Sequence, residues 1–280
     1  MPLAADDQHA RAVAFVALHT GPDAFVIPNP WDAGSARLLA GRGFSALATT
    51  SAGLAHSLGR ADGAGLIARD ETVRNAGAVV AATDLPVSAD LEDCYAGQTG
   101  GIAETIRLAA EAGLVGGSIE DATGDQSAPI LPFEVAVERV AVAVEAARSL
   151  PFPFTLTARA ENFLYGVRDL KDTIRRLQAF EEAGADVLYA PLLPDLDAIR
   201  TVCAEVSRPV NVLAGPTSRV DELAACGVRR ISLGSGLARA ALGAMLRAAR
   251  EIRESGTFTY AAEALPLAEA NSLMRLGDRP

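Results

Sequence analysis

Short apolar runs and helical stretches alternate along the chain, and this alternation limits the possible folds more than any other feature. Eight apolar runs have the length of buried strands and cover residues 24–27, 44–49, 86–90, 115–119, 154–158, 186–190, 209–213 and 229–233. Helical stretches follow them, at residues 35–41, 70–83, 102–112, 132–149, 169–183, 196–206, 219–225 and 238–254. A strand and a helix repeated eight times predict an α/β fold, a (β/α)8 TIM-type barrel.

Glycine marks several of the steps from a helix to the next strand. Gly43, Gly113, Gly184 and Gly227 each follow a helical stretch, where glycine takes a left-handed conformation that other residues resist. Eight such units without a larger interruption favour a closed barrel over the alternative, a doubly wound open sheet.

We expect one domain over residues 1–280. An amphipathic helix near residues 7–20 precedes the barrel proper, which spans about residues 22–255. The C-terminal tail, residues 256–280, keeps one helical stretch at 267–276 and then frays.

The composition argues against two classes of partner. The formal net charge is −10, whereas a nucleic-acid partner needs a basic surface. No apolar run approaches the roughly 20 residues of a membrane-spanning helix, and no basic segment followed by an apolar one begins the chain. We therefore expect a cytoplasmic protein without a nucleic-acid or membrane partner, in which Cys94, Cys203 and Cys226 are reduced thiols.

The active site of a (β/α)8 barrel lies at the carboxyl ends of its strands, so polar residues there are the candidates. Carboxylates dominate: Asp90 and Glu92 follow the third apolar run and Glu120 follows the fourth. One cation, Arg159, follows the fifth. The other candidates are Asn29, Trp31, Asp32, Thr49, Thr50, Ser51, Ala52, Gly53, Asp121, Glu161, Asn211, Gly234, Ser235 and Gly236.

The three acids Asp90, Glu92 and Glu120 predict a divalent metal. Because side chains alternate along a strand, Asp90 and Glu92 are expected on one side, where like charges repel unless a cation or a proton lies between them. Carboxylates without histidine favour a hard, oxygen-ligated ion, Mg²⁺ or Mn²⁺, over zinc. Arg159 would anchor a substrate carboxylate or a developing oxyanion. Its alternative role is only to neutralise Glu120 or Glu161.

Several other candidates have simpler roles open to them. Asp32 can cap the helix that begins near Ala33. Asp93 and Asp121 are expected as solvated loop acids, and Cys94 as a small buried thiol. The segment 234–236 resembles a phosphate cradle at a helix start, but a plain turn is the preferred interpretation.

The rarity of lysine and histidine excludes two reaction classes. Lys171 is the only lysine and falls in a helical stretch, whereas a Schiff-base aldolase needs a lysine inside the barrel. His9 and His19 lie in the N-terminal helical region, which leaves only His56 for a Ser-His-Asp hydrolase, without a Gly-x-Ser-x-Gly motif. Metal-assisted chemistry on a small anionic substrate remains.

An ordered set of short motifs resembles the isocitrate lyase/phosphoenolpyruvate mutase superfamily. The motifs are Asn29-Pro30-Trp31-Asp32-Ala33, Thr50-Ser51-Ala52-Gly53, Ser57-Leu58-Gly59-Arg60-Ala61-Asp62, Ala89-Asp90-Leu91-Glu92, Ser118-Ile119-Glu120-Asp121 and Ala158-Arg159. The resemblance spans residues 10–250, nearly all of the expected barrel.

The resemblance implies a role for each matching residue. Asp90 matches the acid that binds Mg²⁺ directly, whereas Asp62, Glu92 and Glu120 match acids that hold its water ligands; many members have Asp in place of Glu92. Arg159 matches an arginine that contacts the substrate, so the implied catalytic residues are Arg159, Glu120 and Asp62. The implied substrate-binding residues are Ser51, Ala52, Gly53, Trp31, Asp90, Arg159 and Asn211.

The chemistry that this superfamily shares is stabilisation of a 2-oxoacid enolate by Mg²⁺, for which Mn²⁺ is an alternative. The resemblance therefore implies a carbon–carbon lyase that acts on a small 2-oxoacid or dicarboxylate. Family members form dimers or tetramers, often by exchanging the last barrel helix. This implies a homodimer or homotetramer here, with residues 238–254 and the tail as contact segments.

The loop after Glu120 departs from the family pattern. Residues 120–127 contain neither the Cys-Gly-His motif of the lyases nor the lysine and asparagine of the phosphonate-forming mutases. Two alternatives therefore stay open: phosphoenolpyruvate mutase or phosphonopyruvate hydrolase chemistry, and a 2-oxoacid-binding protein without turnover. The remaining proton-donor candidates are Tyr95, Thr123, Asp125 and His56.

Overall fold

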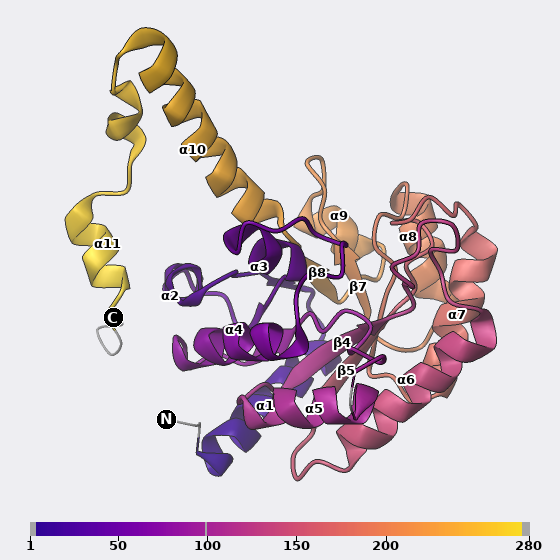
Figure 1. Cartoon of the computed structure of the whole chain (residues 1–280). Helices are drawn as coiled ribbons and strands as arrows, with labels where there is room; N and C mark the ends of the chain where they lie inside the picture. Colours follow the sequence, from indigo (N-terminus) through magenta and orange to yellow (C-terminus); the bar gives the residue numbers. More distant parts are fainter. Residues whose placement is uncertain (1–3, 99, 276–280) are drawn as a thin grey trace.

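The computed structural model describes residues 4–98 and 100–275, and its centre is a barrel of eight parallel strands (Figure 1). The strands are β1 (Phe25–Ile27), β2 (Leu47–Ala48), β3 (Val87–Ala89), β4 (Gly116–Glu120), β5 (Thr155–Arg159), β6 (Val187–Tyr189), β7 (Val210–Leu213) and β8 (Arg230–Ser232). Each lies within or at the edge of one of the eight apolar runs. The α/β (β/α)8 barrel expected from the sequence is confirmed.

Parallel ladders join the strands in the order β1-β8-β7-β6-β5-β4-β3-β2. The longest register aligns the five residues of β4 with those of β5, so that Glu120 lies beside Arg159. No ladder joins β1 to β2 among the described residues. A single backbone hydrogen bond, from Ala48 N to Pro28 O at 3.1 Å, crosses this seam.

Helices surround the barrel and match the expected stretches to within a few residues (Figure 1). They are α1 (Ala5–Thr20), α2 (Ala33–Ala40), α3 (Ser51–Ser57), α4 (Arg69–Ala81), α5 (Gly101–Glu111), α6 (Phe133–Arg148), α7 (Leu170–Glu182), α8 (Leu196–Glu205), α9 (Val220–Ala225), α10 (Gly236–Ser255), the 3₁₀ helix η1 (Thr259–Glu263) and α11 (Leu267–Leu273). The sequence did not indicate α3 or η1. None of the described helices is long and apolar enough to cross a membrane.

Helix α1 packs on the barrel through a small aromatic cluster. Phe15 is fully buried, and His19 makes edge-on contacts with Phe15 and Phe25, with ring centroids 4.6 and 5.1 Å apart. The larger core lies between the barrel strands and the helices of the β3–β8 half.

Helix α10 leaves the barrel instead of packing on it, and η1 and α11 follow as an arm (Figure 1). Ala238 is its only buried residue. Helix α11 returns to α2, where Arg42 pairs with Glu269 at 2.9 Å. The helical tail expected at 267–276 is confirmed as far as Leu273, whereas residues 276–280 lie outside the described residues.

Candidate active site

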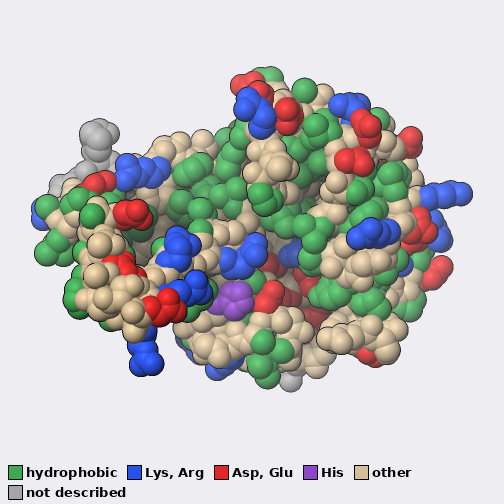
Figure 2. All heavy atoms as spheres, turned by 90° about the horizontal axis from the view of Figure 1, so that it is seen from above, with side chains coloured by type: hydrophobic (Ala, Val, Ile, Leu, Met, Phe, Trp, Pro, Cys, Tyr) green, Lys and Arg blue, Asp and Glu red, His purple; other side chains and the backbone are tan. Residues whose placement is uncertain are grey.

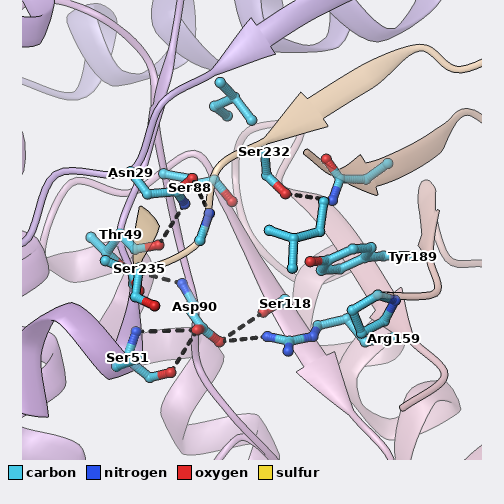
Figure 3. A pocket seen from close by; sticks show the side chains of 18 of the residues that line it. Asn29, Thr49, Ser51, Ser88, Asp90, Ser118, Arg159, Tyr189, Ser232 and Ser235 are labelled. Atoms are coloured by element: carbon cyan, nitrogen blue, oxygen red, sulfur yellow. Dashed lines mark hydrogen bonds and ion pairs between the residues drawn. The ribbon is translucent and has the colours of Figure 1, made fainter. Parts of the chain in front are cut away.

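A cavity of about 150 Å³ opens among residues at and near the carboxyl ends of the strands (Figure 3). Seen from above, acidic side chains gather in a hollow on this face of the molecule (Figure 2). The polar residues that line the cavity are Asn29, Thr49, Thr50, Ser51, Asp62, Ser88, Asp90, Ser118, Arg159, Tyr189, Asn211, Arg230, Ser232 and Ser235.

Asp90 lies at the centre of the hydrogen bonding in this cavity (Figure 3). Its Oδ2 accepts hydrogen bonds from Ser51 N at 3.1 Å and Ser51 Oγ at 2.8 Å. Its Oδ1 accepts from Arg159 Nη1 at 2.8 Å. Burial acts to raise the pKa of Asp90, but Arg159 and Ser51 outweigh it, so the pKa falls below its usual value and the group is an anion.

The segment after β3 is a tight turn rather than a continuing strand. The strand ends at Ala89, and Glu92, Cys94 and Tyr95 have positive φ values of 53°, 56° and 51°. The expectation that strand alternation orients Asp90 and Glu92 is therefore wrong. The two carboxylates are neighbours because the chain turns between them. Left-handed backbone at three non-glycine residues costs on the order of 1 kcal/mol each, and such strain is typical of functional turns.

Arg159 is the cation that the acids of the cavity share. Its guanidinium lies 2.8 Å from Asp90 Oδ1, 3.1 Å from Glu120 Oε2 and 2.7 Å from Glu161 Oε1. Burial acts to lower the pKa of Arg159, but the three carboxylates outweigh it and raise the pKa well above its usual value. The neutralising role is thus present, and the same side chain also lines the cavity.

One guanidinium does not balance the acids around it. Burial, followed by repulsion from Asp90 and Asp62, raises the pKa of Glu92 to about 7. Burial, with Asp90 next, also raises the pKa of Asp62. Burial raises the pKa of Glu120 well above its usual value, against the opposing effect of Arg159. The region holds more carboxyl groups than one guanidinium can neutralise, and a divalent cation would favour their ionised forms.

The donor set fits a hard cation held largely through water. Among the described residues, no group of three His, Cys, Asp or Glu side chains could hold a metal by itself. One acid that contacts the ion, with other acids holding its water ligands, is the arrangement that the resemblance implies for Asp90, Asp62, Glu92 and Glu120. Oxygen donors of this kind and incomplete protein coordination are characteristic of Mg²⁺ sites.

The segment 51–53 is the first turn of α3 and not a loop. Ser51 and Ala52 line the cavity. Gly53 lies behind them, where an added Cβ would come within 2.6 Å of Thr50 Cγ2 and 2.9 Å of Trp31 Cβ. Glycine is therefore required at this position by close packing, whatever its role toward substrate.

The structure brings most, but not all, of the expected site residues to the cavity wall. Ser51, Ala52, Asp62, Asp90, Arg159 and Asn211 line it, whereas Trp31, Gly53, Glu92 and Glu120 do not. Glu120 is connected to the site through Arg159. The roles assigned to all of these residues stay predictions.

The structure confirms the simpler roles expected for Asp32 and Cys94 but not the one expected for Asp121. Asp32 caps α2, with Oδ1 accepting from Ser35 N at 2.7 Å, and Cys94 is a fully buried thiol; both expectations are confirmed. Asp121 is not solvated. It is 2% exposed and pairs with Arg176 at 3.1 Å. Asp93 is partly exposed and lies 3.4 Å from Arg139.

None of the four proton-donor candidates lines the cavity. Thr123 and Asp125 lie in a loop that hydrogen-bonds to itself, through Thr123 Oγ1 to Ala128 O at 2.6 Å and Ser127 N to Asp125 Oδ1 at 2.8 Å. Tyr95 shares a 2.6 Å hydrogen bond with Thr72, and burial raises its pKa. His56 contributes electrostatically to lowering the pKa of Asp62, so it lies near that carboxyl.

Sequence reasoning missed the polar residues inside the barrel. Tyr189 faces Arg159, whose Cζ lies 5.2 Å from the ring centroid. The other missed residues are Ser88, Ser118, Arg230 and Ser232. A barrel interior is normally filled by branched apolar side chains. Serine or arginine within the third, fourth and eighth apolar runs was the signal that could have found them.

Asn29 joins three strand ends at the rim of the cavity. Its Nδ2 donates to Thr49 O at 3.0 Å, and its Oδ1 accepts from Leu233 N at 2.8 Å and Gly234 N at 3.0 Å. The segment 234–236 is therefore a turn anchored by Asn29 at the start of α10. Gly234 and Ser235 also line the cavity, so the choice between a plain turn and a phosphate cradle stays a prediction.

Comparison with known proteins agrees with the fold and with the family that the motifs resemble. A crystal structure of a candidate lyase/mutase from Burkholderia cenocepacia J2315 is 57% identical, with a TM-score of 0.94, and the match covers 98% of this chain and 99% of that one. An uncharacterised protein of Mycobacterium tuberculosis H37Rv is 32% identical over 86% of this chain and 90% of its own length. The 2-methylisocitrate lyase of Shewanella oneidensis MR-1 is 29% identical over 76% and 75%. The family model for phosphoenolpyruvate phosphomutase matches residues 15–253. The chain therefore belongs to the phosphoenolpyruvate phosphomutase family, as its motifs had indicated for the isocitrate lyase/phosphoenolpyruvate mutase superfamily.

Proposed function

We propose that the protein is a Mg²⁺-dependent carbon–carbon lyase that acts on a small 2-oxoacid or dicarboxylate through an enolate. The observation that carries the proposal is the convergence of Asp90, Ser51 and Arg159 on one small cavity. Family membership and the similarity to a 2-methylisocitrate lyase support it. The cavity volume of about 150 Å³ suits a substrate of a few carbon atoms.

Asp90 would hold the metal, with Asp62, Glu92 and Glu120 holding its water ligands. The ion supplies Lewis acidity toward negative charge that develops on the substrate. Ser51 fixes the Asp90 carboxylate with two hydrogen bonds. Arg159 places a fixed positive charge beside Asp90, and it needs no reorganisation because Glu120 and Glu161 hold it in place.

A second candidate function, binding of a 2-oxoacid without turnover, has one observation in its favour. The polar groups of the loop after Glu120 hydrogen-bond within the loop, and none of its residues lines the cavity. If the loop keeps this arrangement with ligand present, no proton donor from it reaches the substrate.

The decisive experiment compares wild type with Asp90→Ala and Asp93→Ala. Release of 2-oxoacids from a panel of dicarboxylates is measured with Mg²⁺ and with EDTA, and phosphorus NMR follows phosphonopyruvate in parallel. We expect EDTA and Asp90→Ala each to lower turnover at least about a hundredfold, the effect of removing one electrostatic group. Asp93→Ala is the matched control, because Asp93 is close in sequence but does not line the cavity.

Three results would contradict the lyase proposal. Turnover that changes neither with EDTA nor with Asp90→Ala would show that the reaction does not need a metal at Asp90. Conversion of phosphonopyruvate alone would favour phosphorus–carbon chemistry. Calorimetry that shows Mg²⁺-dependent oxalate binding with no substrate of the panel converted would favour the binding protein.

We also propose that the protein is a homodimer or homotetramer that associates through α10. Four large apolar side chains on this helix are exposed: Leu242, Met245, Leu246 and Ile252. Exposed apolar surface of this extent on one helix is typical of an interface.

A further inference from the structure

A second arginine lies at the floor of the cavity, apart from the Arg159 cluster. Arg230 is the first residue of β8, is 6% exposed and lines the cavity together with Asn211 and Ser232. These residues belong to β7 and β8. Figure 3 labels Ser232 from this group, across the cavity from Ser51 and Asp90.

Two neutral groups hold Arg230. Its Nε donates to Asn211 Oδ1 at 2.9 Å, and its Nη1 lies 3.5 Å from His19 Nε2. His19 Nδ1 is 2.8 Å from Phe15 O, which can only accept, so Nδ1 carries the hydrogen and Nε2 accepts from Arg230. Burial, with Arg230 next, lowers the pKa of His19 to about 3, so the imidazole is neutral.

No carboxylate compensates the charge of Arg230. The carboxylates of Asp90, Glu120 and Glu161 all pair with Arg159 instead. Within residues 4–98 and 100–275 no acid forms an ion pair with Arg230. Burial acts most strongly to lower its pKa, and the positive charge of Arg159 acts in the same direction. A buried charge without a counter-ion is unfavourable, so an anion bound in the cavity would stabilise Arg230.

The guanidinium keeps donors available for an anion. Its hydrogen bonds to Asn211 and His19 use Nε and Nη1, and Nη2 has no protein partner among the described residues. Among the described residues, no nitrogen of Arg230 is both fully buried and unpartnered, and the residue lines the cavity, so an anion in the cavity is the partner its remaining donors could take. A guanidinium presents paired N–H groups in the geometry that a carboxylate accepts.

We propose that Arg230 binds the second carboxylate of a dicarboxylate substrate, at the β7–β8 side of the cavity. The inference rests on the proposed function, because it places the reacting end of the substrate beside Asp90 and Ser51. It narrows the substrate class to diacids and makes Arg230 a substrate-binding residue. Asn211 orients the guanidinium through Nε and is a positioning residue.

Calorimetry with matched ligand pairs tests this subsite. Each pair joins a diacid to a monoacid of equal chain length: oxaloacetate with 2-oxobutanoate, and 2-oxoglutarate with 2-oxopentanoate, all with Mg²⁺. We expect wild type to bind the diacid of at least one pair about tenfold to a hundredfold more tightly, the range for a hydrogen bond between charged groups. Arg230→Gln should abolish that preference and leave monoacid affinity within about threefold.

Two controls separate the subsite from the rest of the site. Arg229→Gln removes the neighbouring arginine, which does not line the cavity, and should keep the full diacid preference. Oxalate, which has no carbon chain beyond its two carboxylates to carry a further one toward Arg230, should bind wild type and Arg230→Gln alike. Arg230→Lys should retain part of the preference, because it keeps the charge but loses the paired donors.

The outcomes distinguish failure of this proposal from failure of the proposed function. If wild type shows no Mg²⁺-dependent binding of oxalate, the metal site is wrong, and both proposals fail with it. Intact oxalate binding with no diacid preference in wild type would overturn the subsite alone, and this measurement does not depend on a variant that folds. A diacid preference that survives Arg230→Gln would do the same.

Discussion

Arg159 determines the charge balance of the cavity at the scale of single residues. One guanidinium contacts three carboxylates, and each contact draws it toward a different strand end, β3, β4 or the segment after β5. A side chain held from three directions has little rotational freedom left to lose, so its charge is pre-organised. The sequence placed Asp90 and Arg159 at strand ends and named Glu120 or Glu161 as the acid that Arg159 could neutralise, but it did not predict the ion pair with Asp90.

Asp121 shows why residue-level prediction stopped where it did. Its position after Glu120 suggested a solvated loop acid, and its partner Arg176 is 55 residues away on α7. Only the packing of α7 against the loop buries the pair. Long-range ion pairs of this kind leave no local pattern, and the same holds for Arg230 with His19, 211 residues away.

Asp121→Ala should destabilise the protein, although Asp121 does not line the cavity and has no proposed role in catalysis. It leaves Arg176 buried beside only the half-exposed Asp172, and removing one partner of a buried pair costs about 3 kcal/mol. Urea unfolding measures the loss, and adding Arg176→Met should recover part of it. Asp70→Ala, which breaks the exposed pair with Arg74, is the control and should change stability little.

Wild-type stability in Asp121→Ala would show that the pair is not coupled to folding. If adding Arg176→Met does not recover stability, the loss would instead come from the hydrogen bond that Glu161 N donates to Asp121.

At the scale of elements, the strands were predictable because each is a short apolar run bounded by helix and glycine. The turn after β3 was not predictable, because its composition contains no signal for left-handed backbone at Glu92, Cys94 and Tyr95. Contacts from elsewhere hold it: Glu120 N donates to Glu92 O at 3.0 Å, and Thr105 Oγ1 donates to Cys94 O at 2.7 Å. Tertiary structure overrides local preference there.

The docking of α1 is expected to depend on pH through His19. Its pKa is about 3 in the folded protein and near 6.5 when unfolded, so the unfolded chain binds more protons below pH 6.5. The stability contributed by neutral His19 is complete above pH 6.5 and falls as the pH drops toward 3. Between pH 7 and pH 5 the loss should be about 2 kcal/mol, from 1.36 kcal/mol per unit.

Urea unfolding at pH 7 and pH 5 separates this effect from that of the carboxylates. His19→Gln keeps an acceptor for Arg230 and should lose less stability between the two pH values than wild type does. His9→Gln, at an exposed position on the same helix, should behave as wild type. Equal losses in wild type and His19→Gln would mean that His19 is protonated without disturbing the fold.

At the scale of the whole molecule, the eightfold alternation predicted the barrel but not the path of its last helix. Composition and periodicity describe α10 as one more amphipathic helix. The family resemblance had implied residues 238–254 as a contact segment, and the structure shows that apolar side chains of this helix are not covered by its own barrel, with Met245 59% and Leu246 62% exposed. Where a helix packs depends on the surface that receives it, which single-sequence periodicity does not contain.

Leu246→Glu should dissociate the proposed oligomer. A charge placed in the centre of an apolar interface loses its hydration when subunits meet, which opposes association. Sedimentation equilibrium measures the mass of wild type and variant. Val142→Glu, on the exposed face of α6 at 39% exposure, is the matched control and should leave the mass unchanged. A monomeric wild type, or an unchanged mass in Leu246→Glu, would rule out α10 as the contact.

The seam between β1 and β2 has a consequence for ligand entry. Every other neighbouring pair of strands shares a ladder, whereas this pair relies on one backbone hydrogen bond and on the amide of Asn29. Among the described residues, the seam is thus the part of the barrel wall with the fewest backbone hydrogen bonds between strands. The wall that carries Ser51 lies on one side of it, and β8 with Arg230 lies on the other. A ligand that binds both Ser51 and Arg230 would connect the two sides of the seam. Ligand binding would then also stabilise the barrel wall between β1 and β2.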